Sequence, residues 1–545
     1  MLADLPILSL IAFSPLLGVL LLLFMPKDNG KWIKIIGIAA TIIPLILAGW
    51  LYAEFNHQLG TMQFEENYRW ISIDLSKELE QLSQFQQFTL NFNFNIAVDG
   101  LSLPMVFLTA LVSTMAALAS IYIKKRWKTY FILFLILEVG MFGVFMAQDV
   151  FLFFLFFEIA LVPVFFLIGI WGYHNREKAA NKFLIYNGIG SALMLIAFLI
   201  LVTTAGFVVI QGGAVNSVHF SGSLQDITHN LFYNPDALIH TVSGPQNPNP
   251  FYLGKGIKWT IFSLLFVAFA IKLPIFPFHT WMLKVHSEAP PSIVMIHSGI
   301  LLKMGAYGLI RFGVLLFPGE AKEWAYVIGL LGLINIIYGA ILAFVQKDFK
   351  LVLAYSSISH MGIVLLGIAA FNVIGLQGAV FQMVSHGLIS ALMFLIVGSI
   401  YERTQTTQID ELGGLAKSMP FMSGILLIGG MASLGLPGLS GFISEFLAFL
   451  GLFDSMPIIT IISTAGIILT AVYVLRGVLK ITYGPMSEAY ASIRDVRLME
   501  AIPMITLVAF ILLIGLFPAV LSEPLQATVV GFNDFIHTIA MKMGG

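Results

Sequence analysis

Residues 269–313 read FAIKLPIFPFHTWMLKVHSEAPPSIVMIHSGILLKMGAYGLIRFG and place two lysines, Lys272 and Lys303, among strongly apolar neighbours. Two prolines follow Lys272, and each removes a backbone hydrogen bond that a spanning helix would otherwise make. A second interrupted segment, LGLPGLSGFISEF at 434–446, carries Glu445. At membrane depth an interrupted helix is tolerated only where protein or water restores the lost hydrogen bonds. Both segments therefore predict charged sites enclosed within a helical membrane protein.

The composition of the chain excludes the usual soluble classes. Of its 545 residues, 58% are hydrophobic and 10% are charged, whereas a soluble globular chain carries about 25% charged residues. The net charge of −1 provides no basic excess to neutralise the phosphates of a nucleic acid. The chain has no cysteine, which excludes disulfides, thiolate metal sites and iron–sulfur ligation within it. Any redox reaction linked to this protein must therefore take place on another chain.

The hydropathy pattern predicts an all-α polytopic fold in a single membrane domain, 1–545, with about fourteen spans of roughly 20 apolar residues each. The predicted spans are 2–25, 32–52, 98–123, 129–146, 150–171, 178–208, 258–286, 290–314, 323–345, 348–370, 373–402, 418–455, 457–483 and 499–520. Two long polar connections, 53–97 and 209–257, contain Asn, Gln, Gly and Pro. They predict irregular loops, with room for a short hairpin.

The distribution of basic residues predicts the orientation. With the N-terminus placed outside, the inner connections carry 18 lysines and arginines and the outer ones carry 7. Because short cytoplasmic loops are enriched in these residues, both termini and both long loops are predicted to lie on the non-cytoplasmic side. We expect a bacterial plasma membrane as the location.

Several ionisable residues lie inside the predicted spans, where a charge costs about 2.5–3.5 kcal/mol on insertion scales. Such residues usually face a protein interior, and they often mark an ion pathway. The candidate site residues are Glu138, Glu158, Lys272, Lys303, His360, His386 and Glu445. Acids, lysines and histidines thus recur at similar depth on successive spans, which is what a lateral proton relay requires.

Individual ionisable residues of the spans also have purely structural explanations. Glu158 and Lys272 could form an ion pair that fixes helix register, and either mid-span histidine could be a core residue with satisfied hydrogen bonds. Arg476 lies toward the inner end of its span and could reach the interface by snorkelling. Three further histidines near the first break could cap backbone groups: His279, His286 and His297. The joint pattern favours the relay over these separate explanations.

The two interrupted spans lie five spans apart along the chain. An odd offset gives two copies of a repeat opposite topology, and paired broken helices in inverted halves indicate an ion site in transporters. We therefore expect two inverted five-helix repeats, at 129–314 and 323–483. The alternative is that both breaks are ordinary kinks of membrane helices.

Four ordered segments resemble the antiporter-like membrane subunits of respiratory complex I. They are QDVFLFFLFFEIALVPVFFLIGIWG (148–172), the stretch 269–313 quoted above, DFKLVLAYSSISHMG (348–362) and MASLGLPGLSGFISEF (431–446). The resemblance covers nearly the whole chain and is weakest in the long loops.

The resemblance implies roles for the residues of the first half. Glu158 matches the acid of the fifth helix, which pairs with the lysine of the broken seventh helix, here Lys272. Lys303 matches the connecting lysine of the eighth helix. Glu138 is similar to an extra fourth-helix acid found in one branch of the family.

The resemblance also implies roles in the second half. His360 and His386 match relay positions, and Glu445 matches the terminal charged position on the broken twelfth helix. One branch of the complex I subunits carries glutamate there, whereas the other large subunits and the sodium/proton antiporter homologues usually carry lysine.

The implied activity is proton translocation as a membrane subunit of NADH-quinone oxidoreductase, with no cofactor in this chain. NADH, FMN, iron–sulfur clusters and quinone are expected in partner subunits, and antiporter-like neighbours are expected on both sides within the lipid bilayer. One alternative is a subunit of a multi-subunit Na⁺/H⁺ antiporter without a redox partner, and another is the D-type subunit of a photosynthetic complex I. A passive membrane scaffold is a third, and it predicts that neutralising Lys272 or Glu158 leaves coupled activity intact.

Overall fold

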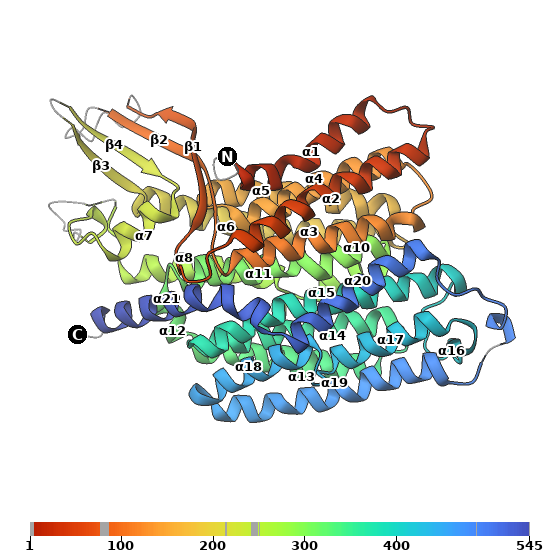
Figure 1. The fold of residues 1–545 in the computed structure, drawn as a ribbon. Coiled ribbons are helices and arrows are strands. Elements are labelled where there is room, and N and C mark those ends of the chain that lie inside the picture. Colours follow the sequence, from red (N-terminus) through yellow and green to blue (C-terminus); the bar gives the residue numbers. More distant parts are fainter. Residues whose placement is uncertain are drawn as a thin grey trace.

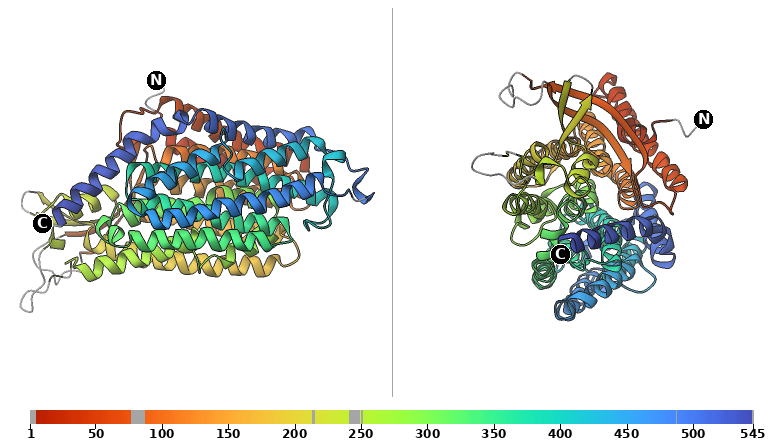
Figure 2. Two further views of the ribbon diagram at one scale, coloured as in Figure 1. Left: turned by 90° about the horizontal axis from the view of Figure 1, so that it is seen from below. Right: turned by 90° about the vertical axis from the view of Figure 1, so that its left-hand side faces the viewer.

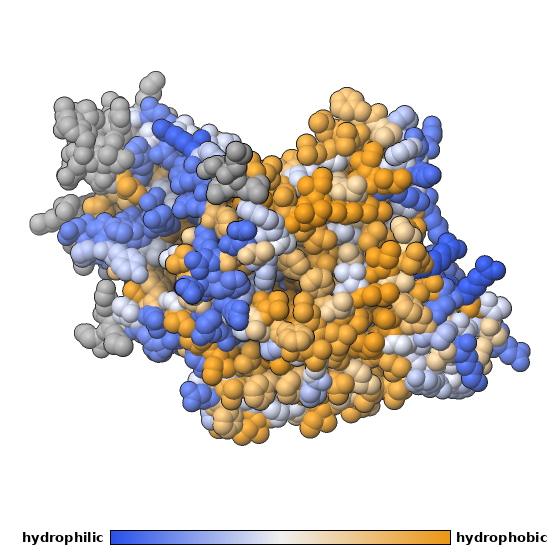
Figure 3. Space-filling model, in the orientation of Figure 1, coloured by the Kyte–Doolittle hydropathy of each residue, from blue (hydrophilic) through white to orange (hydrophobic). Residues whose placement is uncertain are grey.

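The computed structural model describes residues 5–76, 87–212, 215–240, 249, 251–486 and 488–543. Most of its helices lie side by side and run between the same two ends of the molecule, and a small β-sheet lies at one end (Figures 1 and 2). Polar residues gather toward both ends, and a broad apolar band lies between them (Figure 3). The chain is a multi-pass membrane protein, as the sequence predicts.

Twelve helices within the described ranges are long and apolar enough to cross a membrane. They are α1 (Ile7–Phe24), α2 (Gly30–Glu54), α3 (Ser102–Ala119) continued by η1 (Ser120–Tyr122), α4 (Trp127–Met146), α5 (Val150–Trp171), α6 (Arg176–Thr204), the composite helix Pro291–Val314, α13 (Ala325–Val345), α14 (Phe349–Ala369), α15 (Val373–Thr404), α19 (Pro457–Tyr483) and α20 (Leu498–Leu516). The predicted spans 258–286 and 418–455 are each divided into two shorter helices. The total of fourteen crossings stays a prediction.

Aspartate side chains cap the N-termini of two of these helices. Asp149 accepts hydrogen bonds from the N–H groups of Phe151 at 2.9 Å and Leu152 at 3.2 Å, at the start of α5. Asp348 accepts one from Lys350 N at 2.8 Å, at the start of α14. These caps satisfy N–H groups that the first turn of a helix leaves without an internal partner.

The first interrupted segment consists of α8 (Lys255–Lys272) and α9 (Thr280–Glu288), with residues 273–279 non-helical between them. The side chain of Asn335, from α13, bridges this break: its Oδ1 accepts from Phe276 N at 2.8 Å and its Nδ2 donates to Pro274 O at 3.4 Å. Trp281 Nε1 donates to Ile271 O at 3.0 Å. These contacts replace part of the backbone bonding that the break removes, as an interrupted helix in a membrane requires.

The second interrupted segment consists of α17 (Pro420–Ser433) and α18 (Ser440–Ser455). Between them Gly435 has φ +74° and Gly438 has φ +91°, left-handed conformations that favour glycine. A Cβ at position 435 would lie 2.7 Å from Oε2 of Glu445. The break therefore lets the Glu445 carboxylate pack against main chain.

The composite helix Pro291–Val314 is buried along its whole length. It consists of α10 (Pro291–Ile296), the π-helical turn η3 (His297–Leu301), α11 (Leu302–Gly308) and the π-helical turn η4 (Leu309–Val314). Such π-helical turns are rare and often occur at functional sites. Here they bracket the turn that carries Lys303.

The two long loops contain more regular structure than the sequence analysis expected. Loop 53–97 contributes β1 (Gln63–Asp74) and β2 (Gln87–Val98), and β3 (Phe207–Gly212) and β4 (Val215–Ser221) follow α6. The strand order is β1-β2-β4-β3, with β2 and β4 parallel and the other neighbours antiparallel. The expected hairpin is thus present in each segment, whereas the expectation of otherwise irregular loops was wrong for these strands. The alternation of apolar and polar residues in QFTLNFNFNIAV (87–98) is a strand signal.

The remaining elements lie mostly near the ends of the long helices. They are α7 (Leu224–Phe232), η2 (Leu238–His240), α12 (Pro318–Glu323), α16 (Leu415–Ser418), η5 (Glu488–Tyr490) and α21 (Ala519–Met543). Helix α21 reaches the end that carries the sheet (Figure 1). There Thr528 Oγ1 accepts a hydrogen bond from Gly100 N at 2.9 Å.

Candidate functional site

Lys272 ends α8 at the first break, and its side chain is buried. Its Nζ lies 4.7 Å from the ring centroid of Phe157 and has no hydrogen-bond partner within the described part of the chain. Glu158, on α5, is half-buried and interacts electrostatically with Lys272. No direct ion pair joins the two side chains among the described residues. The structure therefore brings the predicted partners near each other without a fixed structural ion pair.

Two histidines for which backbone capping was one possible explanation form a buried pair instead. His286 Nε2, on α9, lies 2.9 Å from Nδ1 of His297, the first residue of η3, and both rings are fully buried. Their other ring nitrogens have no partner within the described ranges. Lys272 and Lys303 both interact electrostatically with His297. The capping explanation does not hold for these two residues, and the pair adds to the set of buried titratable groups near the two lysines.

Lys303 makes the first direct link to the second half. Its buried Nζ hydrogen bonds with Nδ1 of His386, on α15, at 2.7 Å and donates to Ser298 O. His386 Nε2 lies 3.2 Å from Ser357 Oγ. A snorkelling lysine would reach for water, whereas this one ends on a histidine ring inside the protein.

The row continues to Glu445. The ring centroids of His386 and His360 are 5.4 Å apart, and His360 Nδ1 lies 3.6 Å from Glu445 Oε1. Gln382 Nε2 also hydrogen bonds with His360 Nδ1, at 3.1 Å. The buried row is hence Lys303, His386, His360 and Glu445, contributed by α11, α15, α14 and α18.

A cavity of about 20 Å³ lies beside this row. Polar residues on its wall include Ser356, Ser357, His360, His386 and Ser433. A site of this size with several polar partners can hold one water molecule. Such a water could carry a proton between the two rings, which are not hydrogen-bonded to each other within the described residues.

Glu138 lies apart from the row. It is fully buried on α4, and neither carboxylate oxygen has a hydrogen-bond partner among the described residues. Seven residues further along α4, the Phe145 carbonyl accepts a hydrogen bond from Tyr307 OH at 3.1 Å. The role of Glu138 stays a prediction.

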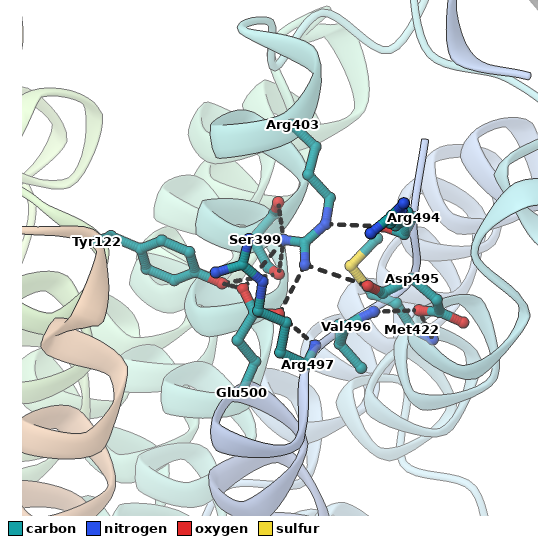
Figure 4. Close-up of polar contacts among 9 residues, drawn as sticks. All are labelled: Tyr122, Ser399, Arg403, Met422, Arg494, Asp495, Val496, Arg497 and Glu500. Carbon is teal, nitrogen blue, oxygen red and sulfur yellow. Dashed lines mark hydrogen bonds and ion pairs between the residues drawn. The ribbon is translucent and has the colours of Figure 1, made fainter. Parts of the chain in front are cut away.

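A separate polar network joins η1, α15 and α20 (Figure 4). Arg403 Nη2 lies 2.6 Å from Glu500 Oε2, and its Nη1 donates to Glu500 Oε1 at 3.1 Å. Tyr122 OH donates to the same carboxylate at 2.5 Å. Arg403 is about 25 Å from His386 along the helix axis, at 1.5 Å per residue. The network therefore anchors one end of the helices and takes no part in the row.

The fold and the buried row define a multi-pass membrane protein in which titratable side chains connect the composite helix to the second interrupted helix. Residues 147–470 match the family described as NADH:quinone oxidoreductase/Mrp antiporter, transmembrane. The chain belongs to this family.

Several relatives are similar over nearly the full length of the chain. The chain is 36% identical to NAD(P)H-quinone oxidoreductase chain 4 3 of Trichormus variabilis, with 97% of this chain and 91% of the relative covered. It is also 36% identical to NADH-quinone oxidoreductase subunit M of Rickettsia prowazekii, with 94% and 96% covered. Among solved structures, a chain of respiratory complex I from Thermus thermophilus aligns with a TM-score of 0.79 and 26% identity over 97% of this chain and 99% of that one.

Proposed function

We propose that this chain is the subunit M type of proton-translocating membrane subunit in a respiratory NADH:quinone oxidoreductase, the type whose mitochondrial counterpart is subunit 4. The observation that carries the proposal is the buried row from Lys303 through both histidines to Glu445, in a chain of this family. A subunit M from Rickettsia and a complex I chain from Thermus, both similar over almost the whole length, support the respiratory assignment.

In this proposal the protein works only within a larger enzyme. NADH, FMN, iron–sulfur clusters and quinone belong to partner subunits, and this chain contributes a proton pathway without a redox centre. Its neighbours are other antiporter-like membrane subunits, and the complex lies in a bacterial plasma membrane. Both termini and the sheet face the non-cytoplasmic side, because short cytoplasmic connections are the ones enriched in Lys and Arg.

Proton transfer begins at Lys272. A nearby carboxylate stabilises the ammonium form of a buried lysine. A change in the position or charge of Glu158 therefore shifts the balance between the protonated and neutral forms of Lys272. The His286–His297 pair offers the next acceptors toward Lys303. From Lys303 the proton passes to His386 through their 2.7 Å hydrogen bond, and then to the second half of the molecule.

The second half completes the route. The proton moves from His386 to His360 with the help of one water, and Glu445 accepts it from His360 across 3.6 Å. The two inverted repeats at 129–314 and 323–483 place one interrupted helix at each end of this route. The redox energy released in partner subunits drives the cycle.

The decisive experiment measures proton pumping by the complex in sealed vesicles after Lys272→Ala. We expect pumping and coupled NADH:quinone activity to fall strongly, while NADH oxidation with an artificial acceptor persists because the flavin lies in another subunit. Glu158→Gln should act in the same direction. Normal pumping by a correctly assembled Lys272→Ala complex would refute the proposal.

Arg476→Ala is the matched control for loss of a cation. The Arg476 guanidinium hydrogen bonds with the Phe344 carbonyl at an exposed position and does not touch the row. This variant should pump at nearly the wild-type rate. Co-purification separates the proposal from a sodium/proton antiporter: flavin and iron–sulfur subunits must accompany the tagged chain, and pumping must persist without Na⁺.

A further inference from the structure

An apolar groove lies between α2, α3, α15, α20 and the beginning of α21, and its volume is about 230 Å³. Among the described residues that line it, only Tyr52 has a polar side chain. The Tyr52 hydroxyl already donates to the Val520 carbonyl at 2.6 Å. The walls therefore offer no free polar side chain to a ligand, and the groove suits an apolar occupant.

The groove covers the half of the spanning region that lies toward the sheet. The last turns of α2, the first turns of α3 and the last turns of α20 line it. On α15 it reaches Leu388, which follows Val373, the first residue of this 32-residue helix, by 15 residues or about 22 Å. Leu388 is thus near the middle of α15. Because the hydrocarbon core of a bilayer is about 30 Å thick, the groove extends from one membrane interface to about the centre, which is the depth of one leaflet.

The mouth of the groove is continuous with the lipid-facing surface. Leu513, on its edge, is 37% exposed, and Ile46, one turn before the lining residue Gly49 on α2, is 66% exposed. Exposed apolar side chains of this kind make up the broad band between the two polar ends (Figure 3). Tyr52 lies near the end of α2, and tyrosine is enriched at the interface between membrane and water because its ring is amphipathic. The acyl chains of the bilayer are therefore the apolar material that adjoins the mouth.

The floor of the groove is the turn of α15 that carries His386. Val384 and Leu388 line the floor and are four residues apart, so they share one face of the helix, and His386 lies between them on the other face. Helix α3 packs closely against this turn, since a Cβ at Gly387 would lie 2.8 Å from Leu108 Cδ2. An empty space at the floor would leave these side chains without partner atoms on one side. An acyl chain supplies those partner atoms behind the buried row.

We propose that this groove binds one acyl chain of a phospholipid from the leaflet on the sheet side, with the chain end at Val384 and Leu388 and the glycerol at the level of Tyr52. The apolar walls, the depth of one leaflet and the continuity with the lipid-facing surface together define this occupant. The bound chain packs behind His386 and supports the turn that carries it. The inference goes beyond the proposed function, because it holds whichever way protons move through the row.

The test is photolabelling of the whole complex in liposomes. One phospholipid probe carries a diazirine at the end of an acyl chain, and a second probe carries it next to the glycerol. After irradiation, chemical cleavage at Met383 and Met393 releases the peptide 384–393, whose mass reports the label. Residues 377–400 of α15 are all buried, so lipid reaches this peptide only through the groove. We expect label on the peptide from the chain-end probe and none from the glycerol probe.

Gly49→Phe fills the groove in the same assay. A Cβ at Gly49 meets no atom within 4 Å, so the new ring has room to take the place of the acyl chain. This variant should lose the label on peptide 384–393. Gly188→Phe, on α6, is the matched control, because a Cβ there also meets no atom within 4 Å and Gly188 does not line the groove. It should keep the label.

The comparison of the two probes needs only the wild-type complex, so it stands even if a variant fails to assemble. Absence of chain-end label on peptide 384–393 would overturn the proposal and leave the groove to a side chain of a neighbouring subunit. Equal labelling by both probes would overturn it as well, and so would label that survives Gly49→Phe. Label that an added long-chain quinone removes would assign the groove to an isoprenoid tail instead of a phospholipid.

Discussion

Replacement of Glu445 by lysine tests what this position requires. It could require any titratable group, or it could require a negative charge next to His360. Glu445 Oε1 lies 3.6 Å from His360 Nδ1. At that distance and an effective dielectric constant of about 20, an imidazolium and a carboxylate attract by about 4–5 kcal/mol. Glu445→Gln removes this attraction, and Glu445→Lys turns it into repulsion of similar size. We therefore expect the lysine variant to pump no better than the glutamine variant.

The size of the effect follows from the same geometry. If water and hydrogen bonds screen two thirds of that attraction, about 1.5 kcal/mol remains, which corresponds to roughly a tenfold smaller population with a proton on His360. Pumping in vesicles of matched complex content should fall by about this factor in Glu445→Gln. The assay compares initial rates of acidification for wild type and both variants. Pumping near the wild-type rate in Glu445→Lys would refute the argument that the field at this site requires an anion.

Three further predictions concern other parts of the structure. Arg403→Ala and Glu500→Gln should each lower the thermal midpoint of the assembled complex, and the double variant should be no less stable than the worse single one, because removing one partner leaves the other buried and unpaired. Gly435→Ala forces alanine into φ +74° beside Glu445 and should destabilise the break by about 1–3 kcal/mol, with a parallel loss of pumping. Burial raises the pKa of Asp149 to about 6. The Asp149 carboxyl group therefore binds its proton more tightly in the folded chain than in the unfolded one. The stability that this protonation contributes is fully present below about pH 4 and is lost as pH rises through about 6. Asp149→Asn should raise the thermal midpoint at pH 7.5 and should no longer raise it at pH 4.5.

The buried charges could be predicted from the sequence because a charge in an apolar run is conspicuous wherever it lies. Which of them touch each other directly could not be predicted from the residues alone. The run FLFFLFF before Glu158 is apolar on every face, so no polar stripe fixes which way the helix turns. The direct contact of Lys303 with His386, and of His360 with Glu445, depends on those rotations.

Neutral polar side chains were missed for a related reason. Ser357 and Gln382 contact His386 and His360, but they carry no charge, and it was the charge of the other side chains that drew attention to them in an apolar span. The cluster SSISH (356–360) was the available signal, since it places small polar residues beside a mid-span histidine. A buried ion pair, in which Arg311 Nη2 lies 2.5 Å from Asp99 Oδ2, was also missed because its members come from opposite ends of two different predicted spans.

The mixed sheet has a consequence for how the chain reaches its final form. Strand β2 leaves the ribosome long before β4, and α3 to α6 lie between them along the chain. Their parallel pairing, such as Leu90 with Phe220, must wait until that later segment has been synthesised. Until then the hairpin of β1 and β2 has an unpaired edge, which can pair with other chains. Closure of the sheet is thus a late, long-range step, and a chaperone on the sheet side that shields this edge would favour correct assembly over aggregation.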